Sequence, residues 1–568
     1  MNMEKSCTQC GLNFMVAKED LIFYEKISPV FGQKKCPIPP PTLCPECRQQ
    51  RRMSFRNERH LYRRKCDVTG KDIISVFPPD SPYKVCDKDH WYSEKFDPLS
   101  YGRPYDFSVS FFDQFKKLSL EVPLASLRVE LSENCDFNND MRECGNCYLC
   151  SRTHSSQSMM YTYRGNKSNN CVDCMQVTDC SFLYECVECV NCQDSRYLFF
   201  SSDCATSAFL LDCRNCMDCF MCCNLRKKRY CFLNEQLTKE QYEKKLKEFD
   251  FGSRRMVQVA QKMYAGIRRK AIRRNLMIVG CEDSTGDNLF NCKNCHDCFG
   301  VQKSTDSKYL WDVKLHHDSM DEYSGGRDSE LMYETTSGSG SYNCLFCLRA
   351  AESQNVLYSW FITASKNIFG SIGIRRGKYC ILNKEYAKEE YEKLMPRIIE
   401  HMQNDSTLAL NRSEATGSWG EFFPASLSPF GYNDTVANEY FPLSQAKAKT
   451  IGYRWQKDEP KASRDQIYAV PDKIDEVKDD VTAQILRCEE CKKNYKIVPQ
   501  ELSLYRERRI PLPDCCVDCR YLKRFAEKNP MRLRSGKCDN CGKTMQTSYP
   551  EETDMHIYCE SCYLNALP

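Results

Sequence analysis

The chain has 568 residues, of which 40 are cysteines, and a formal net charge of only +4. This length exceeds what one hydrophobic core usually holds, so we expect several domains. The small net charge excludes a global field that would attract nucleic acid, although local basic patches remain.

Nothing in the sequence predicts export or membrane insertion. No stretch approaches the roughly 18–20 apolar residues of a membrane span, and the first 17 residues lack the pattern of a secretory signal. We therefore expect a cytoplasmic protein with no membrane partner. In a reducing compartment, cysteine pairs at short spacing favour metal binding over disulfides.

The N-terminal segment, residues 1–127, carries two Cys-x-x-Cys pairs, Cys7/Cys10 and Cys44/Cys47. Structural zinc is held by four ligands in a tetrahedron, and two such pairs can supply all four thiolates. We therefore predict a zinc site here. Residues 48–64 contain seven arginines and no glycine or proline, so we expect a basic helix.

The two pairs, with Phe14 between them and Pro41 before the second, resemble the probable zinc-ribbon (treble-clef-like) family over residues 7–52. The resemblance implies a hairpin knuckle and a helix that carries the second pair. Residues 485–568 contain two further quartets, the first of which matches this plan. The predicted zinc ligands are Cys7, Cys10, Cys44, Cys47, Cys488, Cys491, Cys516, Cys519, Cys538, Cys541, Cys559 and Cys562.

A second ribbon after the N-terminal one looks degenerate. Cys66 lies nineteen residues after Cys47, as Cys538 lies nineteen after Cys519, but Thr69 stands where a second thiolate would be. Cys66 and Cys86 could still hold a metal together with either Asp89 or His90, although a metal-free fold is favoured. Residues 101–123, which follow, are aromatic and amphipathic, and predict a core-facing helix.

The middle of the chain contains an internal sequence repeat. The sequence YCFLN at 230–234 returns 149 positions later as YCILN at 379–383. Short segments with high β-propensity, such as SFLY (181–184) and AFLL (208–211), follow one another too closely for helices to lie between them. Such spacing predicts a parallel β-solenoid. The order of modules also resembles that of a family of cysteine-rich bacterial proteins of unknown function.

The mid-chain cysteines admit two interpretations. The first repeat has seventeen and the second seven, and thiols that pack in a core can be replaced one at a time, whereas metal ligands tend to be lost as sets. Most are therefore interpreted as packing groups. A Cys-x-x-Cys-x-x-Cys run that occurs in both repeats keeps metal binding open. The possible additional ligands are Cys135, Cys144, Cys147, Cys150, Cys281, Cys292, Cys295, Cys298, Cys66 and Cys86.

Each repeat is expected to end in a helix, with Asn234 and Asn383 as N-caps. Residues 254–274 predict a basic amphipathic helix that serves as a docked spacer, with an apolar face formed by Met256, Val259 or Ala260, Met263, Ile267 and Ala271. Residues 403–484 contain no cysteine and several short motifs of aromatic residues and proline, which favours an extended segment on the protein surface. The charged residues 458–480 are expected to form a hinge.

The sequence offers no catalytic constellation. His316, His317 and Asp318 form a tempting cluster, but their neighbours favour a surface loop. Every complete cysteine quartet would leave no open coordination position for a reactive water. We identify no catalytic residue and favour a protein that is not an enzyme.

The sequence therefore predicts a multi-domain, mainly β protein: a central duplicated parallel β-solenoid with capping helices, flanked by N- and C-terminal zinc-ribbon modules. The predicted domains are 1–127 (zinc ribbon, degenerate second ribbon and aromatic helix), 128–253 (first solenoid unit with end helix), 254–279 (basic connecting helix), 280–402 (second solenoid unit with end helix), 403–484 (extended segment and hinge) and 485–568 (tandem zinc ribbons).

The predicted function is that of a zinc-binding scaffold or interaction protein, with three zinc ions expected and up to five possible. Its partner could be a protein, or a nucleic acid or ribonucleoprotein bound by arginines that follow the zinc pairs; no small-molecule substrate is identified. The candidate nucleic-acid contacts are Arg48, Arg51, Arg52, Arg56, Arg59, Arg63, Arg64, Arg520, Lys523 and Arg524.

Two alternatives remain. The first is a thiol-rich redox or zinc-buffering protein, which requires exposed, reactive cysteines. The second, ranked last, is a carbohydrate-acting β-helix enzyme that uses acidic pairs on neighbouring turns. Its candidate acids, which are equally suited to be turn residues, are Asp173, Asp179, Glu185 and Glu188.

Overall fold

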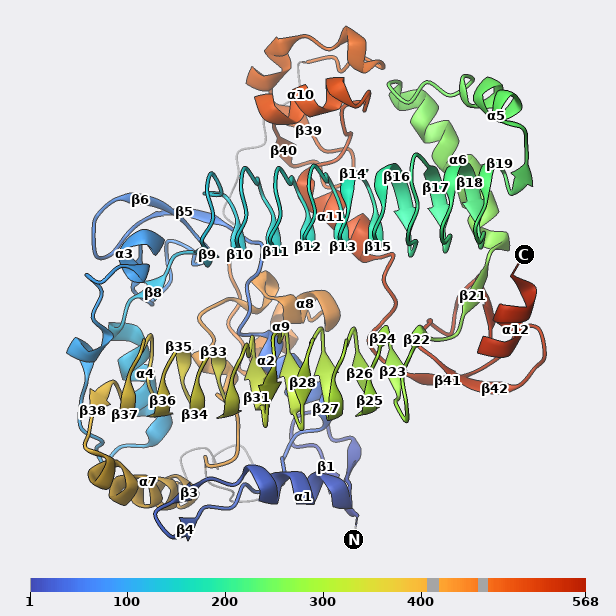
Figure 1. The fold of residues 1–568 in the computed structure, drawn as a ribbon. Helices are drawn as coiled ribbons and strands as arrows, with labels where there is room; N and C mark the ends of the chain where they lie inside the picture. The colour runs from blue at the N-terminus through green and yellow to red at the C-terminus, as the bar shows by residue number, and fades with distance from the viewer. Residues whose placement is uncertain (1, 406–417, 458–467, 568) are drawn as a thin grey trace. The chain divides into compact units, whose positions relative to one another are not determined.

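The computed structural model describes residues 2–405, 418–457 and 468–567, and the predicted hinge at 458–480 lies partly outside these ranges. The chain forms two compact units, shown in Figure 1. Unit 1 comprises Met1–Leu127, Leu276–Lys457 and Met531–Leu533; unit 2 comprises Arg128–Asn275, Asp458–Pro530 and Arg534–Pro568. Each unit therefore combines one stretch of the repeat with a cysteine-rich module from far away in sequence.

The predicted solenoid is confirmed, and its period in unit 2 is twelve residues. Successive parallel strands pair Tyr163 with Met175, Met175 with Val187 and Val187 with Phe199. The same step continues to Leu211 and then to Cys223. Each residue therefore lies directly above the residue twelve positions earlier.

A three-residue rule lies inside this period. Through the solenoid, nearly every third residue has a positive φ, for example Asn170 (50°), Asp173 (53°) and Gln176 (58°). A non-glycine residue in this conformation is uncommon and turns the chain sharply. The residue that follows each corner is typically buried, as Cys171 and Cys174 are. A twelve-residue turn thus contributes four inward side chains.

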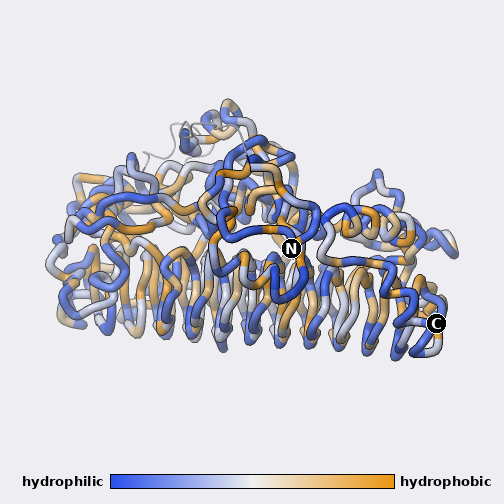
Figure 2. Tube along the Cα trace, turned by 90° about the horizontal axis from the view of Figure 1, so that it is seen from above, coloured by the Kyte–Doolittle hydropathy of each residue, from blue (hydrophilic) through white to orange (hydrophobic). Residues whose placement is uncertain are grey.

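The inward positions explain the cysteines. Cys180, Cys192, Cys204 and Cys216 are twelve residues apart and form one buried column. Each inward side chain is stacked between the turns above and below, so only compact groups fit without strain. In Figure 2 hydrophobic and hydrophilic residues alternate at short intervals along each turn.

The elements of unit 2 begin with the solenoid strands and end with two cysteine-rich modules. Each is a two-stranded hairpin followed by a helix, and we use the name ribbon for this arrangement, here and in unit 1. Its solenoid strands are β9 (Val129–Glu130), β10 (Asn139–Arg142), β11 (Ser151–His154), β12 (Tyr163–Asn166), β13 (Met175–Thr178), β14 (Ser181–Tyr184), β15 (Val187–Val190), β16 (Gln193–Phe199), β17 (Ala208–Leu211), β18 (Met217–Cys223), β19 (Arg229–Phe232) and β20 (Glu235–Gln236). The remaining elements are α5 (Lys239–Leu246), α6 (Arg254–Lys270), β21 (Ile272–Arg274), η5 (Ile474–Glu476), η6 (Asp479–Ala483), β39 (Leu486–Arg487), β40 (Asn494–Tyr495), α10 (Pro499–Glu507), α11 (Val517–Phe525), β41 (Arg534–Lys537), β42 (Thr544–Thr547), β43 (His556–Tyr558) and α12 (Glu560–Ala566).

Unit 1 begins with the N-terminal module and continues with the second solenoid stretch. The module contains β1 (Met3–Ser6), β2 (Asn13–Val16), α1 (Lys18–Ile27), β3 (Val30–Phe31), β4 (Lys34–Lys35), α2 (Pro45–Met53), β5 (Tyr62–Lys65), β6 (Asp72–Ser75), β7 (Val85–Cys86), α3 (Lys88–Tyr92), η1 (Pro98–Tyr101), α4 (Phe111–Glu121) and β8 (Leu124–Ala125). The solenoid strands are β22 (Ile278–Val279), β23 (Gly286–Asp287), β24 (Leu289–Phe290), β25 (Lys293–His296), β26 (Cys298–Phe299), β27 (Thr305–Trp311), β28 (His316–His317), β29 (Met320–Tyr323), β30 (Ser329–Glu330), β31 (Tyr333–Thr336), β32 (Tyr342–Leu345), β33 (Leu348–Ala351), β34 (Gln354–Leu357), β35 (Trp360–Thr363), β36 (Lys366–Phe369), β37 (Lys378–Ile381) and β38 (Lys384–Glu385). They are followed by α7 (Lys388–Gln403), η3 (Ala425–Leu427), η4 (Tyr432–Asp434), α8 (Val436–Tyr440) and α9 (Gln445–Ile451).

One turn of unit 1 contains thirteen residues, because Met320 pairs with Tyr333. Beside this longer turn, His316 and Glu322 are both inward and 0% exposed, with 2.6 Å between Nδ1 and Oε2. Gly325 leaves room for them, since a Cβ there would lie 2.5 Å from the His316 ring. The prediction of a surface loop at His316 was therefore wrong, because this histidine occupies an inward position.

The helices that follow each repeat begin later than predicted. Thr238 caps α5, and α7 begins after Ala387. The two asparagines predicted as caps instead complete the last solenoid turn: the Asn234 side chain accepts a hydrogen bond from the Cys223 N–H, and that of Asn383 from the Ile372 N–H. The repeated YC-x-LN word therefore marks the end of a solenoid, where unpaired backbone groups would otherwise remain.

Three predicted helices keep their place but change in detail. The core-facing aromatic helix is α4, in which Phe111 and Phe115 are fully buried. The basic helix after Cys47 is only α2, which ends at Met53, and residues 62–65 form strand β5. The connecting helix α6 docks through Val257, Ala260 and Tyr264; of the predicted face, Ala260 is buried, whereas Val259 and Met263 are exposed. No helix among the described residues is both long and apolar enough to cross a membrane.

A substitution at Gly286 in β23 can test how tightly neighbouring solenoid turns are packed. Its φ is +139°, and a Cβ would lie 1.7 Å from the carbonyl oxygen of Cys298 on the next turn. We expect Gly286→Ala to lower the free energy of unfolding by about 2 kcal/mol or more, because both backbone strain and overpacking oppose it. Gly326→Ala is the matched control, since nothing lies within 4 Å of its Cβ position. Equal thermal unfolding midpoints for the two variants would contradict the stacking.

Candidate metal centres and the helices that carry them

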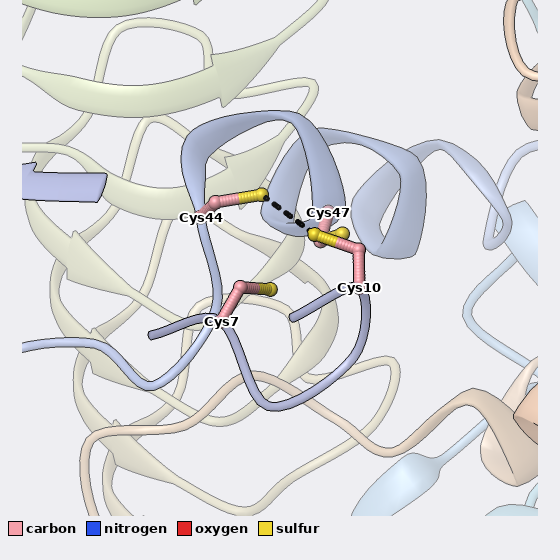
Figure 3. A group of neighbouring side chains, drawn as sticks. All are labelled: Cys7, Cys10, Cys44 and Cys47. Carbon is pink, nitrogen blue, oxygen red and sulfur yellow. Dashed lines mark hydrogen bonds between the residues drawn. The ribbon is translucent and has the colours of Figure 1, made fainter. Parts of the chain in front are cut away.

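Three cysteine quartets can each hold a metal ion. In every quartet the four sulfur atoms lie within 4.8 Å of one another. Figure 3 shows the first, in which the side chains of Cys7, Cys10, Cys44 and Cys47 converge and the Sγ atoms of Cys10 and Cys44 are 3.8 Å apart. The other two are Cys488/Cys491/Cys516/Cys519 and Cys538/Cys541/Cys559/Cys562. All twelve predicted ligands are brought together in the predicted sets.

The first pair of each quartet lies on a tight knuckle. In the first, the N–H of Cys7 donates to the Leu12 carbonyl and the N–H of Gly11 donates back to the Cys7 carbonyl. Gly11 has a φ of 76°, a conformation that suits glycine. The same two hydrogen bonds recur at Cys488 and at Cys538, although Lys492 takes the glycine position at the former with a φ of 60°.

The second pair of each quartet begins a helix. Cys44, Cys516 and Cys559 are the N-cap residues of α2, α11 and α12. The positive end of a helix dipole favours a thiolate over a thiol. At Cys559 the Ser561 hydroxyl and the Cys562 N–H lower the pKa to about 6. At Cys488 burial raises the pKa, but backbone N–H groups outweigh it and bring the value to about 6. These thiols are suited to binding a cation.

The triple-cysteine runs of the solenoid lie at its buried inward positions. Cys144 donates to the Arg142 carbonyl (Sγ to O, 3.3 Å), and Cys298 does the same to the His296 carbonyl (3.3 Å). The other possible ligands of both runs likewise occupy solenoid positions, and within the described residues the metal-competent groups are the three quartets alone. The packing interpretation is therefore favoured for these cysteines.

The degenerate ribbon keeps the knuckle without a quartet. Strands β5 and β6 form its hairpin, and the Cys66 sulfur accepts N–H groups from Thr69 and Asp87, each at 3.2 Å. Cys86 is buried close by, but neither Asp89 nor His90 joins the two sulfurs in a metal-competent group of the described chain. The metal-free fold expected for this segment stays a prediction.

The helix α2 inserts its arginines into the solenoid of unit 1. Arg48 contacts Asp321 (Nη2 to Oδ2, 2.8 Å), and Arg52 contacts Glu334 (Nη1 to Oε2, 2.7 Å). Arg51 also reaches Glu334 at 3.1 Å. The Arg52 and Asp321 side chains are 0% exposed, so these ion pairs lie inside the unit.

Unit 2 contains the same arrangement. Arg520 of α11 contacts Asp173 at 3.2 Å, and Arg524 contacts both Asp173 at 3.0 Å and Glu185 at 3.1 Å. Arg520 and Arg524 follow Cys519 by one and five residues, as Arg48 and Arg52 follow Cys47. Two separate ribbons therefore dock on two separate solenoid stretches through equivalent charges.

An aromatic residue completes each docking corner. The Arg48 guanidinium lies over the Tyr309 ring at 5.4 Å, and that of Arg520 lies over the Tyr161 ring at 4.8 Å. Tyr161 and Tyr309 are equivalent positions of the repeat, one turn before Asp173 and Asp321. The corner residues Tyr–Asp–Glu thus recur at intervals of twelve or thirteen.

These findings correct the predicted nucleic-acid contacts. Five candidates, Arg48, Arg51, Arg52, Arg520 and Arg524, are buried in ion pairs and are not on the surface, so the prediction was wrong for them. Among the others, Arg56, Arg59 and Arg64 are partly buried, whereas Arg63 and Lys523 are exposed.

The carboxylate partners were the part of the site that sequence reasoning missed. The sequence predicts Asp173 and Glu185 as enzyme acids or as turn residues, and both do lie at solenoid corners, but it does not predict their arginine partners or single out Asp321 and Glu334. Their signal was present, because a Tyr–Asp–Glu series at solenoid spacing occurs in both repeats.

A scan of the sequence against models of protein families finds no match, and a search of curated proteins finds none either. The zinc-ribbon assignment therefore stays a prediction, while the three quartets that could hold metal stand on their geometry.

The quartets predict three bound metal ions per chain. We expect Cys541→Ser to remove one of them, because three thiolates and a hydroxyl make a poor site. Native mass spectrometry measures the number directly. Cys36→Ser is the control, since Cys36 is buried but belongs to no quartet. A count above three in the wild type, or an unchanged count in Cys541→Ser, would contradict this assignment.

The docking corner of unit 2 predicts a pH effect. Burial raises the pKa of the Glu185 carboxyl to about 7, and the Arg524 guanidinium offsets only part of this increase. Because the folded pKa exceeds the unfolded one, Glu185 contributes most stability at low pH and loses it as the pH rises through about 7. We expect Glu185→Gln to gain stability relative to the wild type as the pH rises from about 4.5 to about 7, which are the pKa values of the unfolded and the folded carboxyl.

Thermal unfolding at several pH values measures this difference. Glu248→Gln, at an exposed position of the same unit, is the control and should show no trend. A Glu185→Gln difference that is constant with pH would show that the carboxyl titrates normally.

Proposed function

We propose that the protein is a non-enzymatic scaffold in which zinc-closed ribbons are anchored to a β-solenoid that serves as a platform for a protein partner. The observation that carries this proposal is the buried docking of α2 and α11. It joins each of two metal-competent modules to a solenoid stretch through fully desolvated charges. Four thiolates in a closed set are the ligands typical of structural zinc.

The anchoring makes solenoid packing depend on the metal. Without an ion, the four thiolates of a quartet lose the bond that positions the first turn of the ribbon helix. The arginines of that helix would then no longer be held against buried carboxylates. A chelator is therefore expected to loosen both the ribbon and its solenoid corner, which goes beyond a local effect at the cysteines.

The alternatives have weaker support. An enzyme that uses Asp173 and Glu185 needs them free to meet a substrate, yet both carboxylates are engaged by arginines. A redox or zinc-buffering role needs reactive thiols, yet the cysteines of the solenoid are buried apart from the half-buried Cys281.

The docking can be tested by removing one guanidinium. Arg524→Met leaves Asp173, which is 0% exposed, short of a partner, and we expect a loss of about 3–5 kcal/mol in the free energy of unfolding. Arg255→Met, at an exposed position of the same unit, is the control. Hydrogen–deuterium exchange should locate the loosening in α11. An Arg524→Met variant as stable as its control would exclude the proposed anchoring.

Nucleic-acid binding is the other outcome to be tested. With five of the ten candidate contacts buried, we expect no saturable binding of RNA or DNA pools at low salt. If RNA or DNA binds in a salt-sensitive way and Arg63→Glu or Lys523→Glu abolishes this binding, the partner is a nucleic acid and not a protein. Both residues are exposed, so these variants keep the docked corners intact.

A further inference from the structure

In unit 1, the groove beside the docked ribbon helix is filled by the chain's own residues 418–423. The Glu421 carboxylate accepts hydrogen bonds from the Thr42 backbone N–H (3.1 Å) and hydroxyl (2.6 Å). It also contacts the Arg51 guanidinium at 2.9 Å. An acidic side chain of an internal peptide segment thus completes the ribbon surface.

The same segment covers an aromatic row on the solenoid. Tyr358 lies against Trp419 (ring centroids 5.8 Å apart) and against Phe423 (6.1 Å), and its hydroxyl accepts the Gly420 N–H at 2.8 Å. Under the segment, Tyr358 is stacked on Phe346 at 4.5 Å. The segment therefore combines one carboxylate with aromatic side chains.

Unit 2 repeats the walls of this groove. Tyr197 is stacked on Phe209, also at 4.5 Å, one turn after Glu185, as Phe346 follows Glu334. The offset that relates the two ribbons places Asp514 at the position of Thr42 and Lys523 at that of Arg51. Helix α6 covers Phe209 through Tyr264 (5.4 Å between ring centroids).

Between these walls, unit 2 has a cavity of about 250 Å³ where unit 1 has the Glu421 segment. Tyr197 and Phe199 line it from the solenoid, Asp514 and Lys523 from the ribbon, and Arg254 and Gln261 from α6. Lys523 and Gln261 are exposed, so the cavity can be reached from solvent.

The cavity offers cations for an incoming carboxylate. Within the described residues, no hydrogen bond or ion pair engages the Arg254 side chain, and Lys523 pairs only with the exposed Glu490 and the Cys515 sulfur. Asp514 lacks the hydroxyl that Thr42 provides in unit 1. A ligand carboxylate is therefore expected to lie close to Lys523 and Arg254 and away from Asp514.

We propose that this cavity binds a short peptide of a partner protein, in which an acidic side chain is followed by aromatic side chains, as residues 418–423 bind in unit 1. The proposal specifies the partner of the scaffold proposed above and in that sense rests on it. The acidic side chain meets Lys523 and Arg254, and the aromatic rings pack on Tyr197 and Phe199.

The probe is a fluorescent peptide with the sequence of residues 418–424, Ser-Trp-Gly-Glu-Phe-Phe-Pro, added to the full-length protein. Fluorescence anisotropy should show saturable binding of one peptide per chain. Gln261→Trp, which fills the cavity, and Arg254→Glu, which reverses its charge, should each weaken binding at least about tenfold (1.4 kcal/mol or more). A peptide with Gln in place of its Glu should also bind more weakly.

Matched controls are Lys262→Trp and Arg255→Glu, which alter neighbouring exposed residues of α6 outside the cavity lining. Both should bind the peptide as the wild type does. Absence of saturable binding at millimolar peptide, or equal binding by the cavity and control variants, would overturn the proposal. The number of bound metal ions is measured in the same samples. Three ions without peptide binding would contradict the peptide site alone, whereas fewer ions would contradict the scaffold proposal.

Discussion

A buried arginine–carboxylate contact between a ribbon helix and a solenoid corner is the interaction on which the rest of the structure depends. Asp173 and Asp321 are fully desolvated, a state that is tolerated only when cations are held against them. The cations come from helices that begin at cysteine ligands. We therefore expect three events to be linked in each unit: the four cysteines bind a metal, the helix takes its orientation, and its arginines neutralise the buried carboxylates of the solenoid.

The crossed order of the chain gives this interaction a second consequence. The N-terminal ribbon docks on the second solenoid stretch, and the C-terminal ribbon docks on the first. Each unit therefore forms through contacts between residues more than 250 positions apart, such as Arg48 and Asp321. Such contacts carry a large loop-closure cost, which strong, desolvated charges help to offset.

The sequence predicted what local patterns encode. Four cysteines at ribbon spacing predicted each quartet, and the close spacing of short β-type segments predicted the solenoid. The three-residue rule was also present in the sequence, since all the cysteines of the first repeat except Cys223 fall at multiples of three. Whether the arginines are buried or exposed was not predictable from such local patterns. Basic residues after a zinc knuckle look the same whether they face solvent or a buried carboxylate, and only the tertiary fold decides which, as it does for the inward His316.

The most direct test of the account is a double-mutant cycle between Arg524 and Asp173, with Arg524→Met, Asp173→Asn and the double variant compared with the wild type by chemical unfolding. If the two side chains form the buried contact that anchors the ribbon, their effects should fail to add, with a coupling energy of about 1–3 kcal/mol. Additive effects, within about 0.5 kcal/mol, would show that the ribbon helix is held by something else and would contradict the central claim.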